Sequence, residues 1–209
     1  MPERTLVIAT NNQGKLREFR RLFVGCGFDL ATPRDLGYDF DVEETGSTFA
    51  ENARLKAVEA ARLTGMLALA DDSGLEVDHL GGRPGIFSAR YAGGDRTAGD
   101  IAEDEQCRIV LAEMAGVPEE RRTARFRCVI AIATPAGAVR CAEGVFEGRI
   151  GHEPRGDNGF GYDPIFVVAG RDVTSAELAP DEKNAISHRG QAARKALEIL
   201  KEMPFDAAG

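Results

Sequence analysis

The sequence predicts an α/β protein. Short apolar runs typical of strands alternate with longer stretches in which apolar residues recur at helical spacing. Two strand-like runs, 125–134 and 139–146, are joined by a turn at Pro135-Ala136-Gly137, which indicates a β-hairpin. The 209 residues can bury one sizeable core, and they contain no internal repeat, low-complexity segment or linker. We therefore expect a single domain spanning residues 1–209, with two lobes.

The chain begins with a strand over residues 5–9, a polar turn and a helix on which Leu16, Phe19 and Leu22 recur at helical spacing. Such a turn presents backbone N–H groups and the positive end of a helix dipole, which suits a phosphate, although most such turns are only connections and caps. It is not a Walker A loop, because Ala9 and Leu16 replace the first glycine and the Ser or Thr of that motif. The candidate phosphate-binding residues are Thr10, Asn11, Asn12, Gln13, Gly14 and Lys15.

A short strand over residues 28–31 precedes a second helix. Thr48 and Glu51 have the spacing of a capping box, and the apolar stripe that follows stops at Gly65. We expect Lys56 to be a solvated residue of this helix. The acidic loop before the helix contains Glu43 and Glu44. These residues either bind a cation or simply interact favourably with the helix dipole.

A central apolar strand begins at Leu67, leads into Asp71 and Asp72, and is predicted to end in a turn at Ser73-Gly74. Neighbouring side chains on a strand point to opposite faces, so only one of the two carboxylates can face a given cleft. We therefore expect one carboxylate to take part in the chemistry of the site and the other to play a supporting structural role. An ordinary turn is the alternative, because Asp, Ser and Gly favour turns whatever the function.

Apolar spacing predicts a third helix within residues 97–115, ahead of the hairpin. The hairpin forms a long sheet arm that could contribute to a dimer surface. Neither element needs a functional explanation.

A glycine-rich stretch, residues 156–164, leads into a strand over 165–168. The glycines on both sides of Phe160 let its ring stand clear of its neighbours, as stacking on a base requires. A structural loop with a core phenylalanine is the alternative.

The last helix follows Ser187, His188 and Arg189. A cation at a helix N-terminus opposes the dipole, so this pair suggests a ligand that offsets the cost. The alternative is that Ser187 is an N-cap and the two cations are solvated.

The composition excludes several functions. The chain has a formal net charge of −8 and a pI near 5.0, which argues against nucleic acid or membrane surfaces as general partners. The four cysteines are widely spaced, which predicts buried thiols in a reducing compartment. The N-terminal residues lack the apolar region of a signal peptide, and no apolar run approaches membrane-spanning length, so we expect a cytoplasmic protein.

Together these stretches provide carboxylates for a metal, a lysine and backbone donors for phosphates, an aromatic ring for a base and two cationic side chains for base edges. This combination predicts a nucleoside triphosphate site. Magnesium is typically held by one or two carboxylates, waters and the substrate's phosphates, so scattered acidic residues are expected.

The sequence closely resembles the inosine triphosphate pyrophosphatase family. The motifs that carry the resemblance occur in family order over nearly the whole chain: ATNNQGKLREF (9–19), ETGSTFAEN (44–52), ADDSGL (70–75) with GGRPG (81–85) and SARY (88–91), GFGYDPIF (159–166) and SHRGQ (187–191).

This resemblance implies an elongated mixed β-sheet with flanking helices, two lobes around a central nucleotide cleft, a homodimer and dependence on Mg²⁺. It implies hydrolysis of dITP, ITP and XTP to the monophosphate and pyrophosphate. Asp72 would be the general base and a magnesium ligand, Glu43 or Glu44 would help hold the ion, and Ser73 would touch the substrate. Residues 10–15 would bind the triphosphate. The nucleoside pocket would contain Phe160, Gly161, Tyr162, Asp163, Lys183, His188 and Arg189.

Two other functions stay open at this point. A nucleotide-binding regulator would keep the base pocket without catalysis. A Mg-dependent phosphatase or kinase would cleave at a different phosphorus or require an acceptor.

Overall fold

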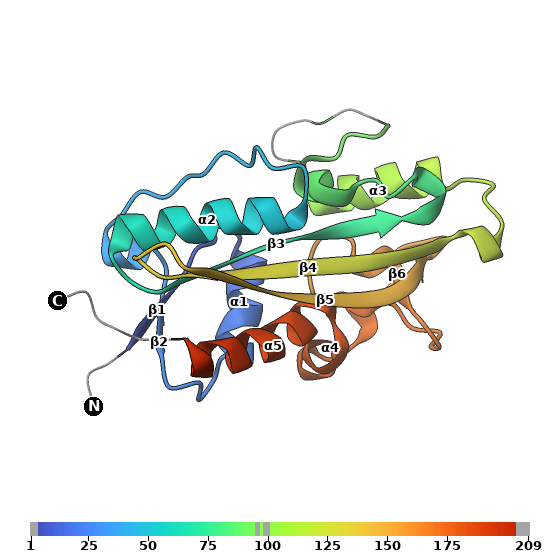
Figure 1. The fold of residues 1–209 in the computed structure, drawn as a ribbon. Coiled ribbons are helices and arrows are strands. Elements are labelled where there is room, and N and C mark those ends of the chain that lie inside the picture. The colour runs from blue at the N-terminus through green and yellow to red at the C-terminus, as the bar shows by residue number, and fades with distance from the viewer. Residues whose placement is uncertain (1–3, 95–96, 98–100, 204–209) are drawn as a thin grey trace. The chain divides into compact units, whose positions relative to one another are not determined.

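The computed structural model describes residues 4–94, 97 and 101–203 (Figure 1). Its strands are β1 (Thr5–Ile8), β2 (Asp29–Ala31), β3 (Ala68–Val77), β4 (Thr123–Ala133), β5 (Val139–Ile150) and β6 (Phe166–Val168). Its α-helices are α1 (Gln13–Leu22), α2 (Phe49–Thr64), α3 (Glu103–Glu113), α4 (Pro180–Ile186) and α5 (His188–Glu202).

The strands form one sheet in the order β2-β1-β3-β4-β5-β6. Strand β1 pairs in parallel with β2 and with β3, whereas β6 pairs antiparallel to β5. The predicted hairpin is present, because β4 and β5 are neighbours joined by a tight turn in which the Gly137 N–H bonds to the Thr134 carbonyl. The structure therefore confirms an α/β fold with a mixed sheet and flanking helices.

The chain divides into two compact units. Unit 1 contains residues 1–72, 128–143 and 189–209, and unit 2 contains residues 73–127 and 144–188. Each unit has a hydrophobic core of its own. Leu6, Phe19, Leu69, Ile130 and Ala196 belong to the core of unit 1. Leu75, Tyr91, Val110, Phe126 and Phe166 belong to the core of unit 2.

Helix α2 has the predicted limits, but only half of the predicted capping box. The Thr48 hydroxyl accepts a hydrogen bond from the Glu51 backbone N–H at 3.1 Å, and Gly65 ends the helix with φ of +67°. The Glu51 carboxylate accepts from the Ser47 N–H and hydroxyl instead of from Thr48. Thr48 therefore caps the helix, while Glu51 binds Ser47, the residue before the cap.

The predicted turn at Ser73-Gly74 is wrong, because β3 continues through it to Val77. A Cβ atom at Gly74 would overlap with the Gly85 carbonyl and the Ser88 hydroxyl, so glycine permits a close approach here and does not end the strand. Asp71 and Asp72 consequently lie in the middle of a long strand.

Two further expectations need correction. Helix α4, just before α5, was not predicted. The third helix begins at Glu103, and residues 98–100 of its predicted range lie outside the described residues.

The cysteine prediction is confirmed only in part. Cys107 and Cys128 are buried, whereas Cys26 and Cys141 are half-buried, and all four are free thiols. Among the residues that the structure describes, no helix is long and apolar enough to cross a membrane.

Candidate functional site

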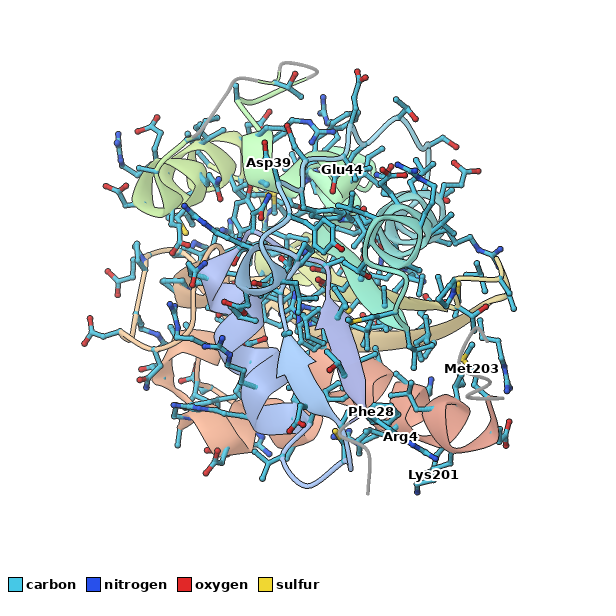
Figure 2. All side chains as sticks on the ribbon, turned by 90° about the vertical axis from the view of Figure 1, so that its left-hand side faces the viewer. Arg4, Phe28, Asp39, Glu44, Lys201 and Met203 are labelled. Atoms are coloured by element: carbon cyan, nitrogen blue, oxygen red, sulfur yellow. The ribbon has the colours of Figure 1, made fainter. Side chains whose placement is uncertain are left out.

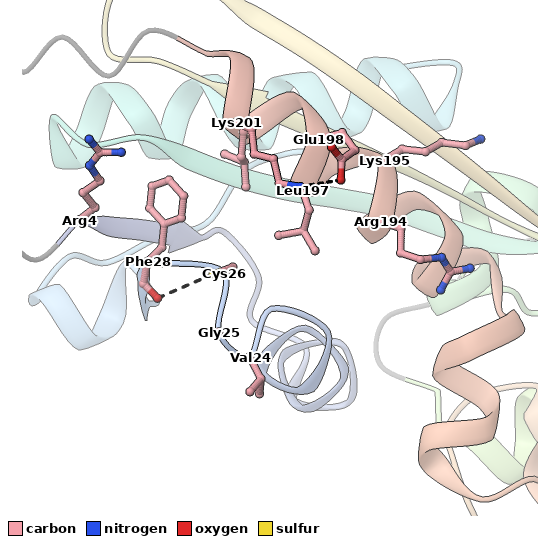
Figure 3. A pocket seen from close by; sticks show the side chains of 12 residues that line it. Arg4, Val24, Gly25, Cys26, Phe28, Arg194, Lys195, Leu197, Glu198 and Lys201 are labelled. Carbon is pink, nitrogen blue, oxygen red and sulfur yellow. Dashed lines mark hydrogen bonds and ion pairs between the residues drawn. The ribbon is translucent and has the colours of Figure 1, made fainter.

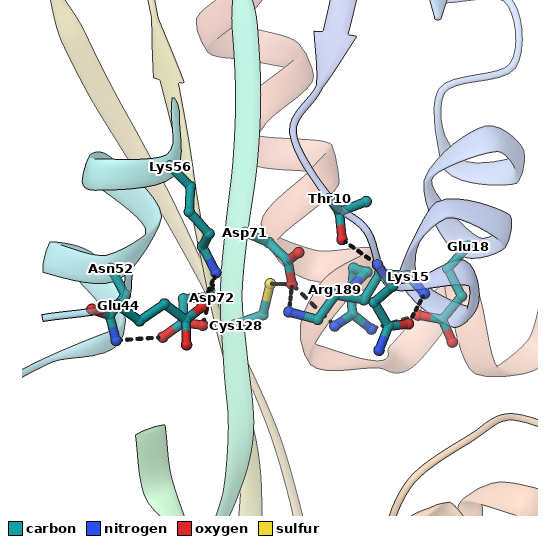
Figure 4. Close-up of polar contacts among 11 residues, drawn as sticks. Thr10, Lys15, Glu18, Glu44, Asn52, Lys56, Asp71, Asp72, Cys128 and Arg189 are labelled. Carbon is teal, nitrogen blue, oxygen red and sulfur yellow. Dashed lines mark hydrogen bonds and ion pairs between the residues drawn. The ribbon is translucent and has the colours of Figure 1, made fainter. Parts of the chain in front are cut away.

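Asp71 and Asp72 point away from one another on opposite faces of β3, as strand geometry predicts (Figure 4). Both are almost fully buried, with exposed fractions of 2% and 5%. Buried carboxylates are stable only when they are paired or hydrogen-bonded. Each therefore anchors a separate polar cluster, and both clusters lie within unit 1.

The Asp72 cluster consists of Glu44, Asn52, Lys56 and Asp72. The Lys56 ammonium lies 2.6 Å from Glu44 Oε1 and 3.1 Å from Asp72 Oδ1. The Asn52 side-chain amide donates to Asp72 Oδ2 at 3.2 Å. Asn52 and Lys56 are four residues apart on α2, so both project from one face of the helix toward β3.

Lys56 was expected to be solvated, and that expectation is wrong. Only 13% of its side chain is exposed. Burial opposes its charged form, but the carboxylates of Asp72, Asp71 and Glu44 raise the pKa of Lys56 above its ordinary value. The missed signal was the spacing of Asn52 and Lys56 beside the buried alanine stripe of α2, because residues four apart share a helix face.

The carboxyl group of Asp72 is less acidic than an ordinary aspartate. Burial raises its pKa, even though the charge of Lys56 acts in the opposite direction. A raised pKa makes a carboxylate a better proton acceptor, which suits the general-base role that the resemblance implies.

Glu44, and not Glu43, is brought to Asp72. Glu43 is exposed, whereas the half-buried Glu44 shares the Lys56 ammonium with Asp72. The donor chemistry fits a magnesium ion, because two carboxylates already surround one cationic group and the remaining ligands of Mg²⁺ are usually waters and phosphates. Within the described part of the chain, no group of three or more His, Cys, Asp or Glu side chains could hold a metal by itself.

The Asp71 cluster consists of Lys15, Glu18, Asp71 and Arg189. Asp71 Oδ2 lies 3.1 Å from Lys15 Nζ and 3.1 Å from Arg189 Nη2, and the other guanidinium arm donates to Glu18 at 2.6 Å. Burial disfavours the Asp71 carboxylate, yet the charges of Lys15 and Arg189 hold its pKa well below the usual range. Asp71 therefore stays ionised and positions two cationic side chains.

The turn at residues 10–15 leads into α1 as predicted. Asn12 caps the helix by accepting a hydrogen bond from the Lys15 N–H at 3.0 Å, and the Thr10 hydroxyl accepts from the Asn12 N–H at 3.2 Å. Asn11 donates its side-chain amide to the Phe40 carbonyl. Gln13 is exposed and Gly14 is buried at the first turn of the helix, where backbone N–H groups are available to a phosphate.

In unit 2, the Phe160 loop (Gly159–Asp163) is held by Asp163. Asp163 Oδ2 accepts from the Phe160 N–H at 2.8 Å and from the Lys183 ammonium at 2.5 Å. That ammonium also lies 5.1 Å from the Phe160 ring centroid. A Cβ atom at Gly159, where φ is +79°, would overlap with Asp163 Oδ2, so only glycine fits there. The loop presents a partly exposed Phe160 ring.

His188 and Arg189, adjacent in sequence, have different environments. The His188 ring stacks on Phe126 with a centroid distance of 4.9 Å and belongs to unit 2. Arg189 belongs to unit 1 and is 1% exposed in the Asp71 cluster. Neither is a solvated residue of the first helical turn, so that alternative reading is wrong. Ser73 is half-buried on β3.

A groove of about 1020 Å³ lies elsewhere in unit 1, between the turn that follows α1 and helix α5 (Figure 3). Arg4, Phe28 and Lys201 line it, and Figure 2 shows them at the opposite end of the view from Glu44. None of its described lining residues belongs to the Asp71 or Asp72 cluster. We therefore do not take this groove as the catalytic site.

The chain is similar over nearly its whole length to characterised relatives. It is 47% identical over 197 residues to a dITP/XTP pyrophosphatase of Bacillus subtilis (strain 168), and the matched residues make up 93% of this chain and 96% of the relative. It is 52% identical over 204 residues to a dITP/XTP pyrophosphatase of Symbiobacterium thermophilum, which covers 96% of both chains.

Solved structures with the same fold include a HAM1 protein from Coxiella burnetii, which is 44% identical with a TM-score of 0.83 and covers 96% of this chain and 100% of that one. A nucleoside-triphosphatase / dITP/XTP pyrophosphatase from Mycobacterium abscessus is 41% identical with a TM-score of 0.72 and covers 95% and 100%. The model of the Ham1 family matches residues 6–199. The chain therefore belongs to the Ham1 family.

Proposed function

We propose that this protein hydrolyses non-standard purine nucleoside triphosphates, namely dITP, ITP and XTP, to the monophosphate and pyrophosphate, and so removes them from the nucleotide pool. The full-length similarity to relatives named dITP/XTP pyrophosphatase supports the substrate class. The observation that carries the chemistry is the pair of carboxylates, Glu44 and Asp72, gathered around one buried ammonium group.

In this proposal Asp72 is the general base. Its carboxylate accepts a proton from the attacking water, whose oxygen bonds to the α-phosphorus as the bond to the bridging oxygen breaks. Pyrophosphate then leaves with the electron pair of that bond. Lys15 and the N-terminus of α1 bind the phosphates and stabilise the charge that develops on them.

Mg²⁺ is the proposed cofactor, with Glu44 and Asp72 as its protein ligands. When bound, it would neutralise negative charge on the phosphates during the displacement. Lys56 would either move aside or share the carboxylates with the ion, since its ammonium contacts both of them.

We propose that the purine base of the substrate is bound by residues of unit 2 and by Arg189. Phe160 would stack on the purine, Lys183, Asp163 and the buried Tyr162 would shape the Phe160 loop, and Gly161, Ser73 and His188 would complete the proposed substrate contacts. Arg189 would read the 6-oxo group. Its ion pairs with Glu18 and Asp71 hold the guanidinium in a fixed orientation, and five N–H donors let one guanidinium serve several acceptors.

We also propose a homodimer, to which the hairpin of β4 and β5 contributes, and action in the cytoplasm, where the free thiols stay reduced. Sedimentation of the purified protein is expected to give twice the mass of the chain. A species with the mass of one chain at micromolar concentration would contradict the dimer.

The proposed function is tested by incubating the purified protein with ITP, XTP, GTP and ATP in Mg²⁺ and analysing the products. We expect IMP and XMP with pyrophosphate, and much slower turnover of ATP and GTP. Orthophosphate as the first product would indicate a phosphatase. Nucleotides that bind but are recovered unchanged would indicate a regulator.

A further inference from the structure

Ser88 connects two segments of unit 2 that are distant from one another in sequence, β3 at Leu75 and the Phe160 loop at Tyr162. Its hydroxyl accepts a hydrogen bond from the Leu75 N–H of β3 at 2.9 Å and donates to the Gly85 carbonyl at 2.6 Å. Its backbone carbonyl accepts from the Tyr162 hydroxyl of the Phe160 loop at 2.9 Å. One residue therefore links Leu75, in the part of β3 that belongs to unit 2, to the loop that presents Phe160.

This connection is closely packed. Ser88 is 8% exposed and Tyr162 is 3% exposed. The backbone of Gly74, two residues after Asp72, lies so close to Ser88 that any added side chain would overlap with its hydroxyl. Because Ser88 packs closely against the Gly74 backbone and is hydrogen-bonded to Leu75, we expect a displacement of Ser88 to shift this part of β3.

The Tyr162 hydroxyl is a permanent donor. Burial raises the pKa of Tyr162 far above its ordinary value, so the hydroxyl keeps its proton at every working pH. The neighbouring Gly161 carbonyl accepts a further bond from the Cys107 thiol at 3.3 Å. The buried side of the Phe160 loop is thus fixed at two consecutive residues.

We propose that Tyr162 is a positioning residue that acts through Ser88: it holds the Phe160 loop in register with the segment of β3 that follows Asp72, so that correct seating of the purine promotes turnover. This inference rests on the proposed function, because it assigns Phe160 to the base and Asp72 to proton transfer. The proposal predicts that substrates with different purine bases differ in kcat and not only in KM. This is expected when binding of the base helps to position the reacting groups.

The test is Tyr162→Phe, which keeps the ring and its packing and removes only the hydroxyl. We expect kcat for ITP to fall about tenfold, within the range that small misplacements of reacting groups cause. KM should change less than twofold, and the ITP preference over ATP should narrow. The matched control is Tyr91→Phe, because Tyr91 is equally buried in unit 2 and bonds through its hydroxyl to Glu113. A fall in kcat of the same size in both variants, or a change in KM alone, would overturn the proposal.

A double-mutant cycle tests the route through Ser88. Ser88→Ala removes the hydroxyl that contacts Leu75 and Gly85 but keeps the carbonyl that contacts Tyr162. If both residues act in one chain of contacts, the double variant should be no slower than the slower single variant. Multiplicative losses would show that the two residues act independently and would contradict the proposal.

Hydrogen exchange tests the positioning role of Tyr162 independently of whether the protein hydrolyses ITP. In Tyr162→Phe we expect faster exchange at the Leu75 N–H, which is bonded to the Ser88 hydroxyl, and no such change in Tyr91→Phe. If the wild-type protein released no pyrophosphate from ITP, the proposed function would fail while the exchange result still tested the structural link. Unchanged exchange at Leu75 in an active enzyme would overturn the link alone.

Discussion

The Lys56 ammonium lies 3.1 Å from Asp72 Oδ1, in a contact that joins helix α2 to the middle of β3 (Figure 4). The same ammonium lies 2.6 Å from Glu44. Lys56 therefore holds two carboxylates together where the proposed reaction requires a cation. This relationship determines how variants of the three residues should behave.

Asp72→Asn should lose most turnover, by about 10² to 10⁴ in kcat, because an amide cannot accept the proton from water. ITP binding, measured by calorimetry, should be largely retained. Asp78→Asn is the control, since Asp78 forms an ion pair with Arg125 on the surface. Near wild-type turnover in Asp72→Asn would exclude Asp72 as the base.

Lys56→Gln should destabilise the fold and make its stability depend more strongly on Mg²⁺. Removing the ammonium leaves Glu44 and Asp72 facing one another without a shared cation, at a cost of roughly 3 kcal/mol. Thermal unfolding with and without Mg²⁺ should show a larger rise in Tm for this variant than for the wild type. Lys201→Gln, which breaks a surface pair with Glu198, is the control. Equal Mg²⁺ effects in the two variants would argue against an ion at the Asp72 cluster.

Hydrolysis in oxygen-18 water should place the label in the nucleoside monophosphate. Attack at the α-phosphorus requires this result, because the water oxygen stays on the phosphorus that it attacks. Mass spectrometry of both products provides the measurement. Label in pyrophosphate would show attack at the β-phosphorus.

Arg189→Lys should narrow the preference for ITP over ATP while largely preserving the fold. Lysine keeps the charge opposite Glu18 and Asp71 but lacks the planar pair of donors that matches O6 and N7 of a 6-oxo purine. Arg189→Ala should reduce ITP and XTP turnover further, at an added cost in stability. Equal losses on ITP and ATP would make Arg189 a phosphate-binding or structural residue.

Phe160→Ala serves as the comparison for Arg189, because stacking does not depend on the substituent at C6. We expect kcat/KM to fall by similar factors for ITP, XTP and ATP. A selective loss on 6-oxo purines alone would place base discrimination at Phe160.

The α/β class and the positions of most elements can be predicted from the sequence, because they depend on local patterns of apolar residues. Alternation along a strand was enough to separate Asp71 from Asp72, because that rule depends only on local backbone geometry. The spacing of Thr48, Glu51 and Gly65 located α2 for the same reason.

Which distant side chains meet depends on how the elements pack and cannot be deduced from local patterns. Lys56 joins Glu44 from 12 residues away and Asp72 from 16, and Arg189 reaches Asp71 across 118 residues. Whether a lysine is solvated, or which of two adjacent glutamates faces a carboxylate, depends on how helix and loop pack on the sheet. The continuation of β3 past Ser73-Gly74 has the same origin: the local turn preference yields to close packing of the strand against Ser88, which only a folded chain can supply.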